Sequence, residues 1–410
     1  MQKGENILSK REMIAIIDKY VPLFFPNLSD INILISQIPC RLKRKDFLYK
    51  NEDPNVKWEM LKNIFEKYDD TTCKISNSNY IIFPEDSIPS QYIEKLINLL
   101  NQKLKKNSVV IFGSDHINFE QFYRYLEKYK EFNEEAFKIV ENDINDIPSD
   151  KPVNLEFIII KDNNNFLNVF LQAKTHPFFG EESLDINMDL YRSKYFYLFS
   201  STMVPFNFMS LICFDYVYRD NYWSNIYSIV KKANQLYFTK RQELDLLIVI
   251  ECNPKPEHKV FKDTLTGFYG EHLFKTPGTR DTISIFVNSS EDSTIESLEK
   301  EECNFGYSHI VLSETYKIPP LKLSELTVDD FDGAPVSRIR FNPHTRLYHV
   351  TLNFLRDKDP RSSRVPVKIN GVYKYFDKKW QKMSSKELLG GEKSIYNVSP
   401  EEQHVEKPNS

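Results

Sequence analysis

Apolar residues recur in this chain with two different periods, which alternate along the first third of the sequence. Short apolar runs of strand type are separated by segments in which apolar residues return every three or four positions, as on one face of a helix. The predicted order is strand, helix, strand, helix, strand, at residues 31–38, 56–68, 79–86, 90–104 and 108–115. This alternation is typical of an α/β layered fold.

The middle of the chain adds a charged segment, a hairpin and further strands. Residues 117–143 are rich in charged side chains and are predicted to form a helical insertion. Residues 154–174 contain two apolar runs around Asp-Asn-Asn-Asn, which predicts a β-hairpin. Further strands are predicted at residues 208–214, 245–251, 281–290 and 307–314.

The two ends of the chain have different patterns. Ser9, with a glutamate three residues later, predicts a capped helix over residues 9–25. Residues 337–357 predict one hairpin, and the Asn-Gly pair within residues 365–376 predicts another. The expected parts are an N-terminal helical segment (1–30), a main domain (31–325), a C-terminal β-hairpin extension (326–384) and a disordered tail (385–410).

Composition narrows the class of protein. With 410 residues, of which 41% are hydrophobic and 14% aromatic, the chain can bury a large core. The formal net charge of -4 does not indicate a nucleic-acid partner. No apolar stretch reaches the ~18 residues of a membrane span, and the first residues lack the apolar core of a secretion signal. We therefore expect a cytoplasmic protein with no membrane partner.

The cysteines do not form a framework. There are five, widely spaced and without a Cys-x-x-Cys pair. Neither a disulfide scaffold nor a zinc site fits this pattern, so no metal is expected.

Three residues with catalytic chemistry each follow an apolar run: Glu85, Lys174 and Cys213. Open α/β sheets place their chemistry at strand ends, where these side chains can meet. A thiol is mostly protonated at neutral pH and needs a base to become a nucleophile. Glu85 could take that proton, Lys174 could stabilise an oxyanion, and the backbone N–H after Cys213 could be a second oxyanion donor.

The segments around these residues resemble motifs of the nitrilase, or carbon–nitrogen hydrolase, superfamily. FPE at 83–85 resembles the family's glutamate motif, KTHPFFGE at 174–181 its lysine motif, and SLICFD at 210–215 its cysteine motif, in the family's order. FGYSHIV at 305–311 resembles a late strand of the family. The resemblance spans about two thirds of the chain.

The resemblance implies an α-β-β-α sandwich in which Glu85 is the general base, Cys213 the nucleophile and Lys174 the electrophilic stabiliser. Family members use a second glutamate after the lysine, a place for which Glu181 and Glu182 compete, with a slight preference for Glu182. Phe214, directly after the nucleophile, is expected to help position the substrate. No cofactor is implied, and a homo-oligomer built by pairing sheets across a dimer is expected.

Each residue also has a simpler interpretation. Cys213 lies in an apolar run where a cysteine is often just buried, Glu85 could be a turn acid, and Lys174 a solvated strand end. Structural roles are at least as good for His116 and His176, and Asp215 is expected to orient a loop. For Phe179, Phe206 and Tyr216, core packing is expected.

The function predicted first is hydrolysis of a small-molecule amide through a thioester at Cys213. Cys-Phe-Asp favours the amide-cleaving branches over nitrile hydrolysis in the family that this chain resembles. An alternative is a nitrilase-like binding or scaffold subunit of a larger assembly, such as a bacterial defence system. The long insertion and the added C-terminal region favour that alternative. A third reading is acyl transfer to an amine in place of water.

Overall fold

The computed structural model describes residues 14–69, 74–178, 181, 189–220, 223–272, 276–299, 301, 303–313, 323–330, 336–354 and 367–389. These residues form two eight-stranded sheets and one three-stranded sheet. In spatial order, sheet A contains β1 (Ala15–Val21), β9 (Tyr195–Ser201), β10 (Asn207–Ile212), β11 (Leu246–Glu251), β12 (Ile283–Asn288), β14 (His309–Ser313), β16 (Val336–Phe341) and β15 (Leu326–Asp330). Sheet B contains β19 (Lys379–Lys382), β18 (Val367–Phe376), β17 (Arg346–Leu352), β2 (Ile31–Gln37), β5 (Tyr80–Ile82), β6 (Ser108–Asn118), β7 (Pro152–Lys161) and β8 (Leu167–Ala173).

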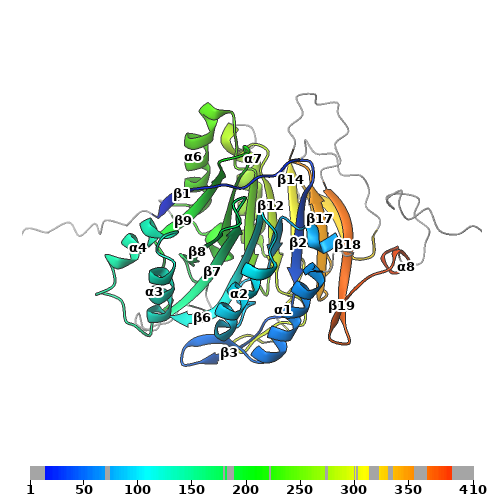
Figure 1. Ribbon diagram of the computed structural model, residues 1–410, viewed down its shortest axis with the longest axis horizontal. Helices are drawn as coiled ribbons and strands as arrows, with labels where there is room; N and C mark the ends of the chain where they lie inside the picture. Colours follow the sequence, from blue (N-terminus) through cyan, green and yellow to red (C-terminus); the bar gives the residue numbers. More distant parts are fainter. Residues whose placement is uncertain are drawn as a thin grey trace, which may run out of the picture.

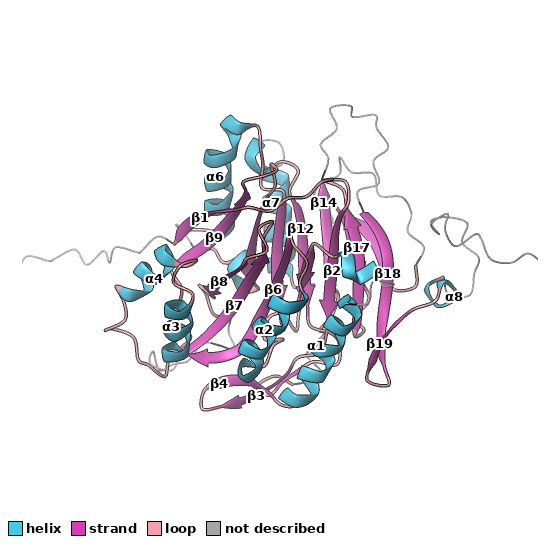
Figure 2. Cartoon of the chain, viewed as in Figure 1, coloured by secondary structure: helices cyan, strands magenta, loops and turns pink. Residues whose placement is uncertain are grey.

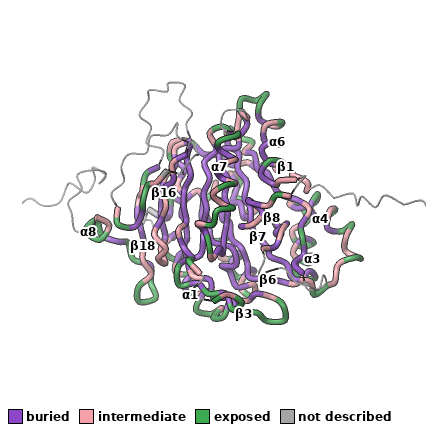
Figure 3. Tube along the Cα trace, turned by 180° about the vertical axis from the view of Figure 1, so that it is seen from behind, coloured by how far each residue is buried: buried purple, intermediate pink, exposed green. Residues whose placement is uncertain are grey.

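The two large sheets pack face to face because their strands are apolar on both sides. In β11, Leu246, Ile248 and Ile250 join the core shared with sheet B, whereas Leu247 and Val249 join a second core on the outer face. This is the period of two expected of a strand that is covered on both faces. Figure 3 shows that the strands are buried along most of their length and that exposure concentrates in loops and outer helices.

Helices cover both outer faces, which gives the α-β-β-α sandwich that the family resemblance implies (Figures 1 and 2). The outer core of sheet A includes residues of α6 (Asn225–Tyr237) and α7 (Lys259–His272). Three helices belong to the opposite side: α1 (Pro54–Asp69), α2 (Ile93–Lys103) and α3 (Phe119–Lys128). With α4 (Glu134–Glu141), α3 confirms the helical character predicted for residues 117–143.

The helix predicted over residues 9–25 is wrong for the part that is described. This segment forms β1, which pairs in parallel with β9. Ile14 and Ile16 pack on the outer core, and Ala15 and Ile17 pack on the core between the sheets. Alternate residues therefore contact different layers, and pairing with the edge of β9 outweighs the local helical spacing.

The hairpin predicted over residues 337–357 is also wrong. Both strands exist, but β16 pairs with β14 and β15 in sheet A, whereas β17 pairs with β2 and β18 in sheet B. The chain crosses from one sheet to the other at the turn between them. The segment predicted as a C-terminal hairpin extension, residues 326–384, thus contributes strands to both sheets of the sandwich.

The Asn-Gly pair within residues 365–376 does not form a turn. Asn370 and Gly371 lie inside β18, where Asn370 is the additional residue of a β-bulge against β17. The turn falls later, at Asp377 and Lys378, whose φ angles of 48° and 58° indicate a two-residue hairpin turn into β19.

The tail predicted to be disordered from residue 385 begins with a short helix, α8 (Ser385–Leu388). Ser384 caps it, because its side chain accepts a hydrogen bond from the backbone N–H of Glu387. The rest of the predicted tail lies outside the described residues. Within the described part of the chain, no helix combines the length and apolar character that crossing a membrane requires.

A buried polar network joins the two sheets near the middle of the sandwich. Glu156 of β7 accepts hydrogen bonds from Ser210 Oγ of β10 and from Gln172 Nε2 of β8, the latter at 3.0 Å. Gln172 also donates to the Ser210 carbonyl at 2.9 Å and accepts from Tyr197 N at 2.8 Å. Burial raises the pKa of Glu156 to about 8, although the Ser210 hydrogen bond opposes this shift.

Glu156→Gln is expected to reduce the loss of stability that accompanies a rise in pH from about 5 to about 9. Because the folded pKa is raised from 4.5 to about 8, this carboxyl group contributes stability that is complete below pH 4.5 and is lost as pH rises through about 8. Urea unfolding should show the native protein losing at least about 1 kcal/mol more than Glu156→Gln between about pH 5 and pH 9. Equal losses in the two proteins would contradict a neutral Glu156.

Candidate active site

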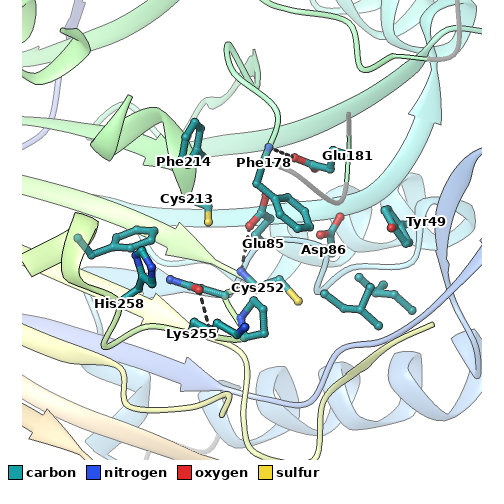
Figure 4. A pocket seen from close by; sticks show the side chains of 15 residues that line it. Tyr49, Glu85, Asp86, Phe178, Glu181, Cys213, Phe214, Cys252, Lys255 and His258 are labelled. Carbon is teal, nitrogen blue, oxygen red and sulfur yellow. Dashed lines mark hydrogen bonds between the residues drawn. The ribbon is translucent and has the colours of Figure 1, made fainter. Parts of the chain in front are cut away.

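The three predicted residues come from three strand ends at one edge of the sandwich. Glu85 follows β5, Lys174 follows β8, and Cys213 lies between β10 and the short helix α5 (Phe214–Val217). Glu85 and Cys213 line one cavity of about 280 Å³ (Figure 4). Lys174 is fully buried and contacts Glu85 directly. The structure thus brings Glu85 into contact with Lys174 and places Glu85 and Cys213 on one cavity.

Lys174 is held between two carboxylates. Its Nζ donates to Glu85 Oε1 and to Glu181 Oε2, each at 2.7 Å. Asn154 of β7 bridges the same carboxylates, because its Nδ2 donates to Glu85 Oε1 at 2.8 Å and to Glu181 Oε1 at 2.7 Å. His116 Nε2 lies 3.3 Å from Glu181 Oε1. Five side chains thus fix one another, which keeps the two carboxylates in place.

The end of β11 fixes the other oxygen of Glu85. The backbone N–H of Cys252, one residue past β11, donates to Glu85 Oε2 at 2.9 Å. The same strand also holds the candidate nucleophile. The backbone N–H of Cys213 donates a hydrogen bond to the carbonyl of Ile250, within β11, at 2.8 Å. A single strand end therefore sets the position of the carboxylate relative to the thiol.

The backbone at Cys213 is in an unusual conformation. Its φ of 42° and ψ of -103° lie outside the regions that residues with a side chain ordinarily adopt. Such strain persists only where the surroundings impose it, and it gathers at functional sites. The bend carries the side chain into the cavity, as Figure 4 shows, and begins α5 at Phe214, which also lines the cavity.

A glycine permits the turn that carries Glu85. Gly113 of β6 accepts a hydrogen bond from Ile88 N at 3.0 Å and donates one to the Pro84 carbonyl at 3.2 Å. A Cβ at Gly113 would lie only 2.7 Å from the Cα of Glu85 and 2.8 Å from the backbone N of Asp86. The turn can approach β6 this closely only because the side chain is absent.

Charge and burial oppose each other at this site. Burial acts against the charge of Lys174, but the carboxylates of Glu181 and Glu85 outweigh it and raise the lysine pKa well above its ordinary value. Burial also opposes ionisation of Glu181, yet Lys174 and His116 lower its pKa to about 2. Burial and the Glu85 carboxylate raise the pKa of Cys213 well above its usual range, against the pull of Lys174. The resting site therefore contains an ion pair network beside a neutral thiol.

Asp215 orients the loop after Lys174, as the sequence predicts. Its Oδ1 accepts hydrogen bonds from Thr175 N at 3.0 Å, Thr175 Oγ1 at 2.6 Å and His176 N at 2.9 Å. Because Asp215 lies two residues after Cys213, it ties the nucleophile segment to the lysine segment. Asp215 thus positions the two segments and does not line the cavity.

The other predicted residues divide into two groups. Glu181 joins the Lys174 network, whereas its competitor Glu182 lies outside the described residues, as does Phe179. Phe206 and Tyr216 are fully buried in the two cores, as expected for packing residues.

The two histidines make different structural contacts. His176 stacks on Tyr218 with ring centroids 3.2 Å apart, and burial lowers its pKa to about 3. It does not line the cavity. His116 is buried and contacts Glu181 Oε1, whereas Lys174 bonds to Oε2 of the same carboxylate, so His116 supports the network through the other oxygen.

Sequence reasoning missed Asn154, the Cys252 backbone and the far wall of the cavity. Asn154 is the one amide side chain in the largely apolar strand Pro152–Lys161. A polar side chain at such a position was the feature of the sequence that could have indicated it. The far wall comes from the three-stranded sheet of β13 (Thr294–Ile295), β3 (Arg41–Lys45) and β4 (Leu48–Asn51), which no local pattern links to the site. Among the described residues, no group of three or more acidic, histidine or cysteine side chains is placed to hold a metal ion.

Comparison with known proteins finds likeness in solved structures only. No family model and no curated protein matches the sequence. The glutamine-dependent NAD+ synthetase of Acinetobacter baumannii matches with 15% identity and a TM-score of 0.41, over 82% of this chain and 49% of that one. An amidase of the nitrilase superfamily from Nesterenkonia AN1 matches with 8% identity and a TM-score of 0.39, over 78% and 92%. The carbon–nitrogen hydrolase of Helicobacter pylori G27 matches with 11% identity and a TM-score of 0.39, over 76% and 88%.

The resemblance to the nitrilase superfamily rests on the sequence motifs around Glu85, Lys174 and Cys213. The chain spans about half the length of the NAD+ synthetase. At this identity and TM-score, the solved structures carry neither an activity nor a substrate to this chain. Any functional proposal has to come from its own residues.

Proposed function

We propose that this chain is an amidase-like carbon–nitrogen hydrolase that works through a thioester at Cys213. Glu85 is the general base, Lys174 stabilises the oxyanion, and Glu181 with Asn154 positions Glu85 and Lys174. The observation that carries the proposal is the shared cavity: the Cys213 thiol and the Glu85 carboxylate line it, and Lys174 bonds to Glu85 at 2.7 Å.

In the first half-reaction, Cys213 Sγ attacks the amide carbonyl while Glu85 accepts the thiol proton. The raised pKa of Cys213, caused by burial and by Glu85, makes such a base necessary, because the resting thiol is neutral. The Lys174 ammonium and the backbone N–H of Phe214, at the start of α5, stabilise the oxyanion. Glu85 then returns the proton to the leaving nitrogen, the C–N bond breaks, and the acyl group stays on Cys213.

In the second half-reaction, water attacks the thioester. Glu85 takes one proton from that water and returns it to the departing Cys213 sulfur, so the carboxylic acid leaves and the starting state is restored. Lys174 and the Phe214 N–H stabilise the second oxyanion in the same place. The reaction consumes one water per amide and needs no other reactant.

Mass spectrometry of the intact protein with a p-nitrophenyl ester tests the proposal. An acyl adduct on Cys213 is expected in the native protein and in Cys252→Ala, and none in Cys213→Ala. Cys252 is a matched control because its thiol lines the same cavity and its contact with Glu85 is made by the backbone. Equal acylation of both cysteines, or of neither, would refute the mechanism.

A binding or scaffold subunit is the second candidate function. The observation in its favour is the burial of Cys213, which is 7% exposed and has a pKa raised well above its usual range. The scaffold interpretation predicts that Glu85→Gln leaves the acylation rate of Cys213 unchanged. The hydrolase interpretation predicts a fall of at least about 10²-fold, since the general base is lost.

A further inference from the structure

Asp86 is a buried acid that the proposed mechanism does not use. It follows Glu85 directly, lines the same cavity, and is 5% exposed. Its backbone carbonyl accepts a hydrogen bond from Asn51 Nδ2 at 3.1 Å, but its Oδ1 has no hydrogen-bond partner among the described residues. A buried carboxyl oxygen without a partner is costly, and a ligand that supplies a donor would remove that cost.

The surroundings of Asp86 favour a positive charge. Burial and the nearby carboxylates of Glu85 and Glu181 raise the pKa of Asp86 well above its ordinary value, with Lys174 acting the other way. Burial is the larger cause of this shift; the smaller cause, the negative potential of the Glu85 and Glu181 carboxylates, also attracts an ammonium group. Lys174 does little to cancel this potential, because its charge is shared between two carboxylates at 2.7 Å.

The cavity wall near Asp86 suits the chain that would carry such a group. Tyr49 and Phe178 offer aromatic surface, and Leu42 and Ile295 offer aliphatic surface. Figure 4 places Asp86 and Tyr49 on one side of the cavity and Lys255 and His258 on the other. A cation next to Asp86 is therefore kept apart from the basic residues of the lining and lies near aromatic rings, which attract cations.

We propose that the substrate is an amide whose acyl part ends in an amine, and that Asp86 binds this ammonium group while the carbonyl lies at Cys213. The ω-amino acid amides are the simplest compounds of this class. Assigning the amine to the acyl part depends on the proposed hydrolysis at Cys213. The amine takes no part in bond breaking, so the products are an ω-amino acid and ammonia.

Turnover of matched amides tests the specificity. δ-Aminovaleramide and hexanamide have the same number of non-hydrogen atoms and differ by an ammonium in place of a methyl group. The native protein should favour the cationic amide by at least about tenfold in kcat/KM, and the anionic glutaramate should be the poorest of the three. Asp86→Asn should abolish the preference, mainly through the KM of δ-aminovaleramide. A preference for hexanamide in the native protein would overturn the proposal.

The control is the same aspartate-to-asparagine change at a position outside the cavity. Asp46→Asn alters an aspartate in the β3–β4 turn whose φ of 50° resembles the 54° of Asp86, and asparagine tolerates such angles. Asp46 does not line the cavity, so Asp46→Asn should keep the native preference. Loss of the preference in both variants would indicate a general structural effect and contradict a specific role of Asp86.

A binding measurement separates this inference from the proposed hydrolysis. In Cys213→Ala, which cannot form a thioester, calorimetry should show δ-aminovaleramide binding at least about tenfold tighter than hexanamide. That preference without turnover in the native protein would refute the hydrolase and keep Asp86 as a cation site. Turnover together with equal binding of the two amides would keep the hydrolase and refute the role of Asp86. Because both ligands are compared on one protein, the result does not depend on whether Asp86→Asn folds.

Discussion

Lys174→Met is expected to abolish amide hydrolysis and to destabilise the protein by about 3–5 kcal/mol. The lysine is fully buried. Its Nζ lies 2.7 Å from one carboxylate oxygen of Glu85 and 2.7 Å from one carboxylate oxygen of Glu181. Its removal leaves two buried carboxylates without a cation and takes away an oxyanion donor, which alone costs about 10²–10³-fold in rate. Ammonia release and urea unfolding measure the two effects.

The pH dependence of unfolding makes this prediction specific. In the native protein the pKa of Glu181 is lowered to about 2 by Lys174 and His116, so its contribution is present above pH 4.5 and is lost as pH falls through about 2. In Lys174→Met the buried carboxyl is no longer held ionised, so stability should rise between about pH 7 and pH 5.

Lys161→Met supplies the matched control for the lysine. Lys161 is also buried, at the end of β7, but its Nζ bonds to Asn101 Oδ1 at 2.9 Å and to no described carboxylate. This variant should keep amide hydrolysis and should not become more stable on acidification. Identical behaviour of the two variants would remove the special role assigned to Lys174.

Gly113→Ala is expected to lower kcat by about 10²-fold while the protein remains folded. The new Cβ would lie 2.7 Å from the Cα of Glu85 and 2.8 Å from the N of Asp86, and both of these contacted atoms belong to the backbone of the turn. The turn must move outward, which displaces Glu85 from Lys174 and from the Cys252 N–H. The strain should also reduce the free energy of unfolding by about 1–3 kcal/mol. Steady-state kinetics and urea unfolding test both effects.

Gly267→Ala is the control for this substitution. Gly267 lies in α7, where an added Cβ meets nothing within 4 Å. Alanine favours helix over glycine by up to about 1 kcal/mol, so the variant should be slightly more stable and equally active. Unchanged kcat in Gly113→Ala would show that the Glu85 turn can shift without loss of geometry.

The convergence of the site could be predicted because it depends on a regular property of sheets. Each of Glu85, Lys174 and Cys213 follows an apolar strand. The strands before Glu85 and Lys174 belong to sheet B, the strand before Cys213 belongs to sheet A, and chemistry gathers where such strands end. Asn154 and Asp86 could not be predicted in this way. Asn154 lies inside a strand, and the environment of Asp86 depends on β3, β4 and β13, whose packing no local pattern encodes.

The two wrong predictions of secondary structure also arise because contacts distant in the sequence decide the outcome. The spacing of apolar residues in 9–25 fits a helix and a two-sided strand, and only the free edge of β9 decides between them. Likewise, the turn after β16 is locally compatible with a hairpin, but open edges in both sheets accept the two strands separately. Non-local pairing overrides local preference in both segments.

The place of β17 between β2 and β18 has a consequence for the newly made protein. Ile31 of β2 pairs with Leu352 of β17, so β2 completes its pairing only after about three hundred further residues have left the ribosome. Until then this apolar strand presents an open edge of the kind that recruits strands from other chains. The nascent chain is therefore most vulnerable to aggregation during that interval, when shielding by a chaperone would matter most.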